Sequence, residues 1–88
     1  MQEKAEKLIK ALGEIIQQHR KQTGKSAYKI SAESSIPKPT WIRIEKAKYG
    51  DIKFTNIWKI AEGLDMYPDE LIKELRLKLG DDFSLIDD

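Results

Sequence analysis

Apolar residues recur every three or four positions through most of this chain, and the first such run is the longest. It starts near residue 2, ends near residue 22 and contains Ala5, Leu8, Ile9, Leu12, Ile15 and Ile16. This spacing places one apolar stripe along a helix and is typical of an amphipathic helix packed on a core. Gly24 follows, and glycine just past the last periodic residue commonly ends a helix. The pattern therefore predicts a long first helix over about residues 2–22.

Two short helices are predicted next. Ser26 is an N-cap candidate for a helix that ends near residues 34–35. A third helix, over about residues 38–47, opens at Pro37 or Pro39. Proline is tolerated there because the first turn of a helix has no intrahelical use for its N–H groups.

The fourth helix is predicted after a loop. Segment 46–54 breaks the periodicity and contains a glycine, which is typical of a loop, and we expect Ile52 and Phe54 to attach it to the core. The helix that follows covers about residues 55–63, and its inner face would contain Ile57, Ile60, Ala61 and Leu64.

A fifth helix opens at Pro68, with Asp69 and Glu70 in the first turn, where the helix dipole favours negative charge. Gly80 ends it. Its predicted apolar stripe consists of Leu71, Ile72, Leu75 and Leu79. The five segments together predict an all-α fold.

Length and charge divide the chain into two unequal parts. Eighty-eight residues supply one modest hydrophobic core, so we predict one domain over residues 1–80 and a short acidic tail over residues 81–88. The tail carries four aspartates and no cation, and it is either disordered or a short element packed through its apolar residues, Phe83, Leu85 and Ile86.

The middle of the chain has the opposite charge. Residues 20–59 contain ten Lys or Arg residues and three acids, a net charge of +7, although the whole chain carries only +1. A basic surface of this kind suits a polyanionic partner. The alternative is that these lysines only solvate the helices.

Several functions are disfavoured by what the sequence lacks. It contains no cysteine, so disulfides and thiolate metal sites are excluded, and His19, the single histidine, cannot form a zinc site alone. No Gly-rich phosphate loop and no acid pair with catalytic spacing is present, so we expect no enzyme, metal, cofactor or small-molecule ligand. Without a signal-like segment or a run of 18 apolar residues, we expect a cytoplasmic protein that does not contact the membrane.

Small and apolar residues recur at the spacing of a helix-turn-helix unit. Ala27 and Ser31 are four residues apart, Ser35 follows after four more, and Trp41 and Ile44 follow at six and three. These positions correspond to the first helix, the close contact between the helices, the turn and two core anchors of the second helix. The second helix of such a unit is the one that enters the DNA major groove.

Three segments of the chain carry a family resemblance. They are "LGEIIQQHRKQTGKS", "IPKPTWIRIEKAK" and "IWKIAEGLDMYPDELI". From about Leu12 to Ile72 the sequence resembles the Cro/repressor-like (Xre) family of helix-turn-helix DNA-binding domains, chiefly through "RIEKAK" followed by "KIAEGL". The resemblance implies a compact five-helix lambda-repressor-like domain. It also implies a transcriptional regulator, a repressor in particular, that binds double-stranded operator DNA as a homodimer.

The resemblance further implies that Arg20 and Glu45 form a buried ion pair that ties the first and third helices together. The chain departs from the family pattern at four places. Ser26-Ala27 stands where the family commonly has Ser-Gln, Ser35 where it commonly has glycine, prolines open the third helix, and Ile42 replaces an often polar residue.

On this reading the third helix reads the bases. Arg43 lies three residues after Thr40 and hence on the same side of the helix, and Lys38 and Pro39 share its first turn. An arginine can bind guanine O6 and N7 with two hydrogen bonds, while Thr40 and Pro39 can touch a thymine methyl group. Phosphate contacts are predicted from the flanking cations and from backbone N–H groups at two helix starts, namely Lys25, Ser26, Lys29, Lys46, Lys48, Lys53 and Thr55.

A second class of function is left open by the sequence. The fold would be kept, the DNA face would be weakened, and the apolar side chains of Trp58, Ile42 and the tail would bind a protein partner, as in an antitoxin-like accessory subunit. The prolines and Ala27 favour this alternative, while the net charge of residues 20–59 favours DNA.

Overall fold

Residues 3–86 are described by a computed structural model of the chain, which contains five helices and, over these residues, no strand. The helices are α1 (Glu3–Thr23), α2 (Ala27–Glu33), α3 (Lys38–Glu45), α4 (Phe54–Gly63) and α5 (Pro68–Leu79). The prediction of an all-α fold with five helices is confirmed. Gln2, where the first helix was expected to begin, and the aspartates Asp87 and Asp88 lie outside the described residues.

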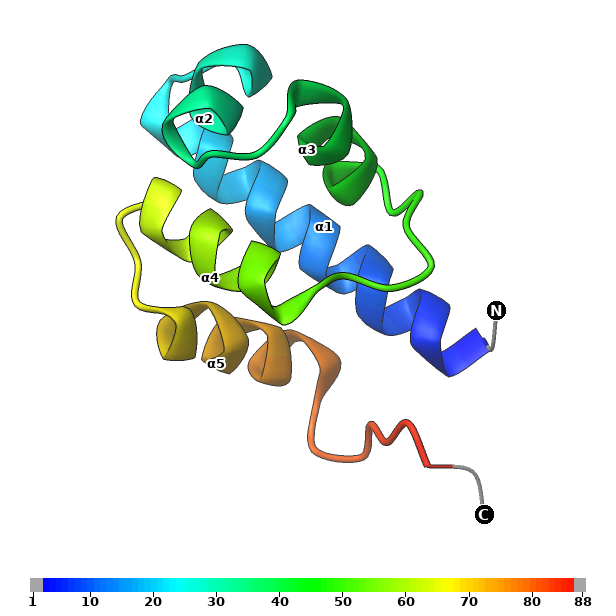
Figure 1. Ribbon diagram of the computed structural model, residues 1–88. Coiled ribbons are helices and arrows are strands. Elements are labelled where there is room, and N and C mark those ends of the chain that lie inside the picture. The colour runs from blue at the N-terminus through cyan, green and yellow to red at the C-terminus, as the bar shows by residue number, and fades with distance from the viewer. Residues whose placement is uncertain (1–2, 87–88) are drawn as a thin grey trace.

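The helices surround one core. In Figure 1, α1 runs through the middle of the molecule, with α2 and α3 above it and α4 and α5 below it. All five helices contribute buried residues to this core, and six of its large side chains are essentially inaccessible to solvent: Ile16, Ile30, Trp41, Ile44, Ile60 and Leu71. The radius of gyration is 12.7 Å, close to the about 12 Å expected for a compact domain of this length.

Two glycines allow the helices to approach closely. A Cβ atom on Gly13 would lie 2.6 Å from the carbonyl oxygen of Ile44 and 2.8 Å from that of Glu45, so the backbones of α1 and α3 are nearly in contact. A Cβ atom on Gly63, at the end of α4, would lie 1.8 Å from Oγ of Ser34, which follows α2. Neither close approach follows from the periodicity of the sequence.

Three helices end in the same way. After α2, α3 and α4 the chain passes through a left-handed residue, Ser35, Ala47 or Asp65, with φ of 56°, 57° and 57°. At each end the next N–H group bonds back across the last turn, for example from Ile36 to the carbonyl oxygen of Ser31 at 3.0 Å, which is the pattern of a Schellman motif. The turn between α2 and α3 is thus built without glycine, at a conformational cost of about 1 kcal/mol.

The predicted helix boundaries lie within about two residues of the observed ones. Ser26 caps α2 as predicted, because its Oγ accepts the Lys29 N–H at 3.1 Å. However, α3 ends at Glu45 rather than near residue 47, because Ala47 adopts the left-handed conformation of the Schellman motif. Similarly, α4 begins at Phe54, one residue before the predicted start.

Two predicted core contacts are wrong. Phe54 is 70% exposed: it lies in the first turn of α4, four residues before Trp58, and the centroids of the two rings are 6.4 Å apart. Ile72 is 41% exposed on α5, although Leu71 and Leu75 on the same helix are buried as expected. Ile52 does pack against the core.

The described part of the acidic tail contacts α1. The chain turns at Gly80 with φ of 89°, and the Lys7 ammonium then lies 6.0 Å from the ring centroid of Phe83. Lys4 Nζ donates a hydrogen bond to the carbonyl oxygen of Ile86 at 3.2 Å. Phe83 is half-buried while Leu85 and Ile86 are exposed, and residues 81–86 form no helix or strand.

Candidate nucleic-acid interface

The two sides of α3 differ in exposure and chemistry. Trp41 and Ile44 are buried, with exposed fractions of 0% and 1%. Lys38, Pro39 and Arg43 are exposed on the opposite part of the helix, and Thr40 is half-buried. The predicted base-contacting residues therefore lie on one accessible surface, which presents a guanidinium, an ammonium and small apolar groups.

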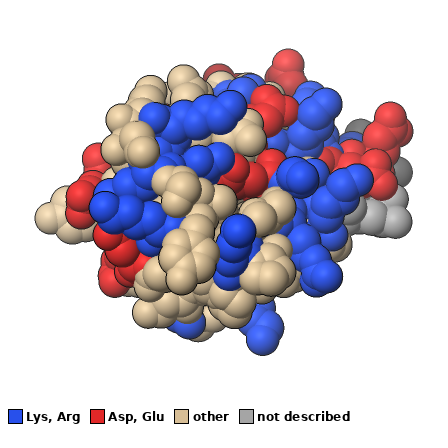
Figure 2. Space-filling model, turned by 90° about the horizontal axis from the view of Figure 1, so that it is seen from above, with Lys and Arg blue, Asp and Glu red and all other residues tan. Residues whose placement is uncertain are grey.

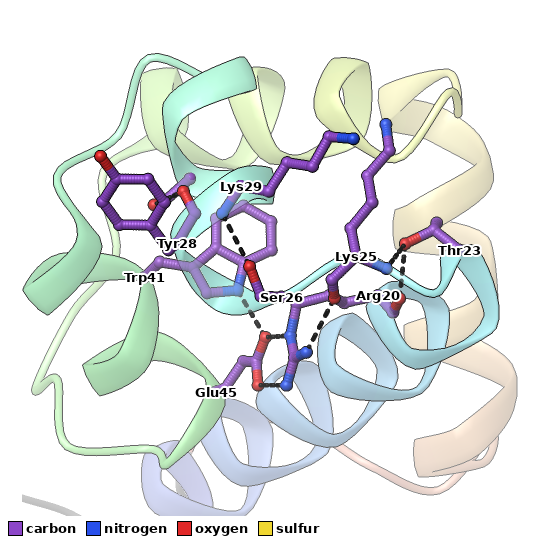
Figure 3. Close-up of polar contacts among 9 residues, drawn as sticks. Arg20, Thr23, Lys25, Ser26, Tyr28, Lys29, Trp41 and Glu45 are labelled. Carbon is purple, nitrogen blue, oxygen red and sulfur yellow. Dashed lines mark hydrogen bonds and ion pairs between the residues drawn. The ribbon is translucent and has the colours of Figure 1, made fainter.

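A buried ion pair fixes the position of α3 on α1. Arg20 donates to both carboxylate oxygens of Glu45, from Nε at 2.6 Å and from Nη2 at 3.0 Å (Figure 3). The Glu45 side chain is only 5% exposed and that of Arg20 is 16% exposed. The Trp41 indole N–H donates to the same carboxylate, and Arg20 Nη1 donates to the carbonyl oxygen of Lys25 at 3.1 Å. The structure thus contains the ion pair that the resemblance implied, and the carboxylate raises the pKa of Arg20 through its hydrogen bond.

Basic side chains cover the surface formed by α2 and α3. Figure 2, which views the molecule from above Figure 1, shows Lys and Arg predominating over Asp and Glu on this side, with uncharged residues between them. The predicted phosphate-contacting lysines Lys29, Lys46, Lys48 and Lys53 are exposed. Thr55 is also exposed, in the first turn of α4, where Lys53 occupies the N-cap position without a side-chain cap.

Two members of the predicted phosphate-contacting set are engaged within the protein. The Lys25 ammonium lies 2.6 Å from a carboxylate oxygen of Glu33, and this hydrogen bond raises the pKa of Lys25 and lowers that of Glu33. The Ser26 hydroxyl accepts the Lys29 N–H. A phosphate group at this end of α2 would have to displace Glu33 from Lys25. The side chain of Lys29 points away from the Arg20–Glu45 pair (Figure 3).

Tyr28 belongs to the same surface and was missed by the sequence analysis. Its side chain is 70% exposed on α2, and the Lys38 ammonium lies 5.8 Å from the centroid of its ring. A cation held over an aromatic face is attracted by the ring electrons, so Tyr28 restrains the first basic side chain of α3. The signal available in the sequence was an aromatic residue between lysines in "KSAYK".

Comparison of the chain with protein-family models, curated proteins and solved structures found no match.

A polar contact joins α1 to α5. His19 Nε2 on α1 lies 2.8 Å and 3.0 Å from the two carboxylate oxygens of Glu74 on α5. Within residues 3–86, no three His, Cys, Asp or Glu side chains are grouped closely enough to hold a metal ion. None of the helices in this part of the chain is both long and apolar enough to cross a membrane.

Proposed function

We propose that this protein is a sequence-specific regulator of transcription, of the repressor type, that binds double-stranded DNA by placing α3 in the major groove. The observation that carries the proposal is the two-sided character of α3. One side is fixed to α1 by Trp41, Ile44 and the Arg20–Glu45 pair, and the other presents Arg43 and Lys38 to solvent. A rigidly held helix with exposed hydrogen-bond donors is what direct reading of base edges requires.

The surroundings of α3 support the same proposal. Lys46, Lys48 and Lys53 follow α3 and can neutralise backbone phosphates on one flank, and Lys29 lies on the α2 side. The unit of α2, a tight turn and α3 has the order and spacing of a helix-turn-helix, and it lies within the stretch from about Leu12 to Ile72 over which the sequence resembles the Cro/repressor-like (Xre) family. From that resemblance we propose a lambda-repressor-like domain that binds as a homodimer in the cytoplasm, without a cofactor.

Selection from a pool of random DNA duplexes tests this proposal. We expect the enriched duplexes to share a two-fold symmetric sequence whose half-sites are centred about one helical turn, roughly 34 Å, apart. Each half-site should contain a guanine opposite Arg43 and a thymine near Thr40 and Pro39. Failure to enrich any sequence over the starting pool would reject sequence-specific recognition and favour the protein-interaction alternative.

A further inference from the structure

A second accessible surface lies on α4 and α5, on the lower side of the molecule in Figure 1. Three of its apolar side chains are largely exposed: Phe54 by 70%, Trp58 by 50% and Ile72 by 41%. Isolated exposed apolar residues are ordinary in proteins, but contiguous ones commonly mark an interaction site.

These side chains line a groove made of two adjoining hollows. Phe54, Ile72 and Asp69 line the first hollow, and Glu62, Asp65 and Tyr67 line the second. Trp58 and Pro68 line both, so the two hollows adjoin at these residues, and together they make up a groove between α4 and α5. We refer to it as the α4–α5 groove. Its apolar walls can accommodate a large side chain from another molecule.

The charged residues of the groove indicate what kind of segment it can bind. The charged residues that line it are Glu62, Asp65 and Asp69, and in the described part of the chain no Lys or Arg lines either hollow. Glu62 is held beside the ring of Trp58, because the indole N–H donates to its carboxylate at 2.9 Å. Apolar walls with carboxylates on the rim complement a segment that carries apolar and basic side chains together.

We propose that the α4–α5 groove binds a segment of a partner protein in which an aromatic or aliphatic anchor residue is flanked by Lys or Arg. DNA does not fit, because the rim is negatively charged. A second copy of this groove fits poorly, because a two-fold axis would bring the carboxylates of Glu62, Asp65 and Asp69 against their own copies. The proposal does not depend on DNA binding by the α2–α3 surface and is tested without DNA.

The test uses two designed peptides of about 16 residues. Both carry Leu and Trp at positions i, i+3, i+4 and i+7 of a helix, and one has Lys where the other has Glu on the flanking positions. Binding to the 15N-labelled protein is followed by NMR, including the indole N–H of Trp58. We expect the basic peptide to shift resonances of α4 and α5 and to bind about tenfold more tightly than its acidic twin, with the difference reduced by salt.

Charge reversal supplies the control. In the variant Glu62→Lys/Asp69→Lys, the preference should invert in favour of the acidic peptide, whereas Glu3→Lys/Glu6→Lys on α1, with the same change in net charge, should keep the wild-type preference. Should the first variant unfold, Glu62→Gln/Asp69→Asn should weaken the preference, because only Asp65 then remains charged in the groove. The proposal would be overturned if both peptides bound equally well or if resonances outside α4 and α5 shifted instead. It would also be overturned if the basic peptide shifted no resonance at millimolar concentration. Sedimentation showing a dimer with a protected Trp58 would instead assign the groove to a second copy.

Discussion

Replacing Glu45 with alanine probes the contact that positions α3. The substitution removes two charge-assisted hydrogen bonds from Arg20, at 2.6 Å and 3.0 Å, and the acceptor of the Trp41 indole N–H. Arg20 keeps only the carbonyl oxygen of Lys25 and remains mostly buried. Loss of one member of a buried ion pair costs about 3–5 kcal/mol. Because Arg20 is 16% exposed, water can reach it in part, and we expect about 3 kcal/mol.

Urea denaturation followed by circular dichroism measures this loss. With a denaturant slope of about 1 kcal/mol per molar urea, the midpoint should fall by about 3 M. Glu14→Ala is the matched control, because Glu14 also pairs across the helices, with Lys78 at 3.3 Å, but both side chains are more than 40% exposed. That variant should lose at most about 1 kcal/mol. Equal midpoints for Glu45→Ala and Glu14→Ala would refute the assignment of a structural role to the buried pair.

Three further predictions concern stability and ionisation. Ser35→Gly should raise the free energy of unfolding by about 1 kcal/mol in urea titrations, because glycine adopts a φ of 56° without strain. Gly13→Ala should lower it by about 2 kcal/mol or more, since a Cβ atom there meets backbone 2.6 Å away, while Gly50→Ala, with open space around it, should change it little. By NMR titration, the pKa of Glu33 should lie below the ordinary value and rise toward it in Lys25→Met. Any stabilisation from this pair is fully present at a pH above the pKa that Glu33 has in the unfolded chain. It is lost as the pH falls through the lower pKa that Glu33 has in the folded protein.

The sequence pattern was sufficient for the helices and for the inner side of α3. Trp41, Ile44 and Ile60 follow the helical period, and all three are buried as predicted. The period is informative because a helix that packs on one side must repeat its apolar residues every three or four positions. The same rule failed at Ile72, and Phe54, which was predicted to attach the preceding loop to the core, is exposed as well, because a large apolar residue can also lie on the surface.

Contacts between segments distant in the chain were less accessible to sequence reasoning. The Lys25–Glu33 pair and the position of Lys38 over Tyr28 depend on how α2 is rotated relative to its neighbours, which periodicity does not specify. The tight packing at Gly13 and Gly63 likewise depends on interhelical distance. The Arg20–Glu45 pair was predicted only because the family resemblance linked two residues 25 positions apart.

The measurement that most directly tests the proposed function is duplex DNA binding as a function of salt, compared between wild type, Arg43→Ala and Lys48→Ala. For wild type, log K should fall linearly with log salt. Arg43→Ala should cost about 1–3 kcal/mol and relax the preference at one position of each half-site, whereas Lys48→Ala should weaken binding to all sequences alike and reduce the salt slope by about one. No salt-sensitive binding at tens of micromolar protein, or an Arg43→Ala variant unchanged in affinity and preference, would contradict the account.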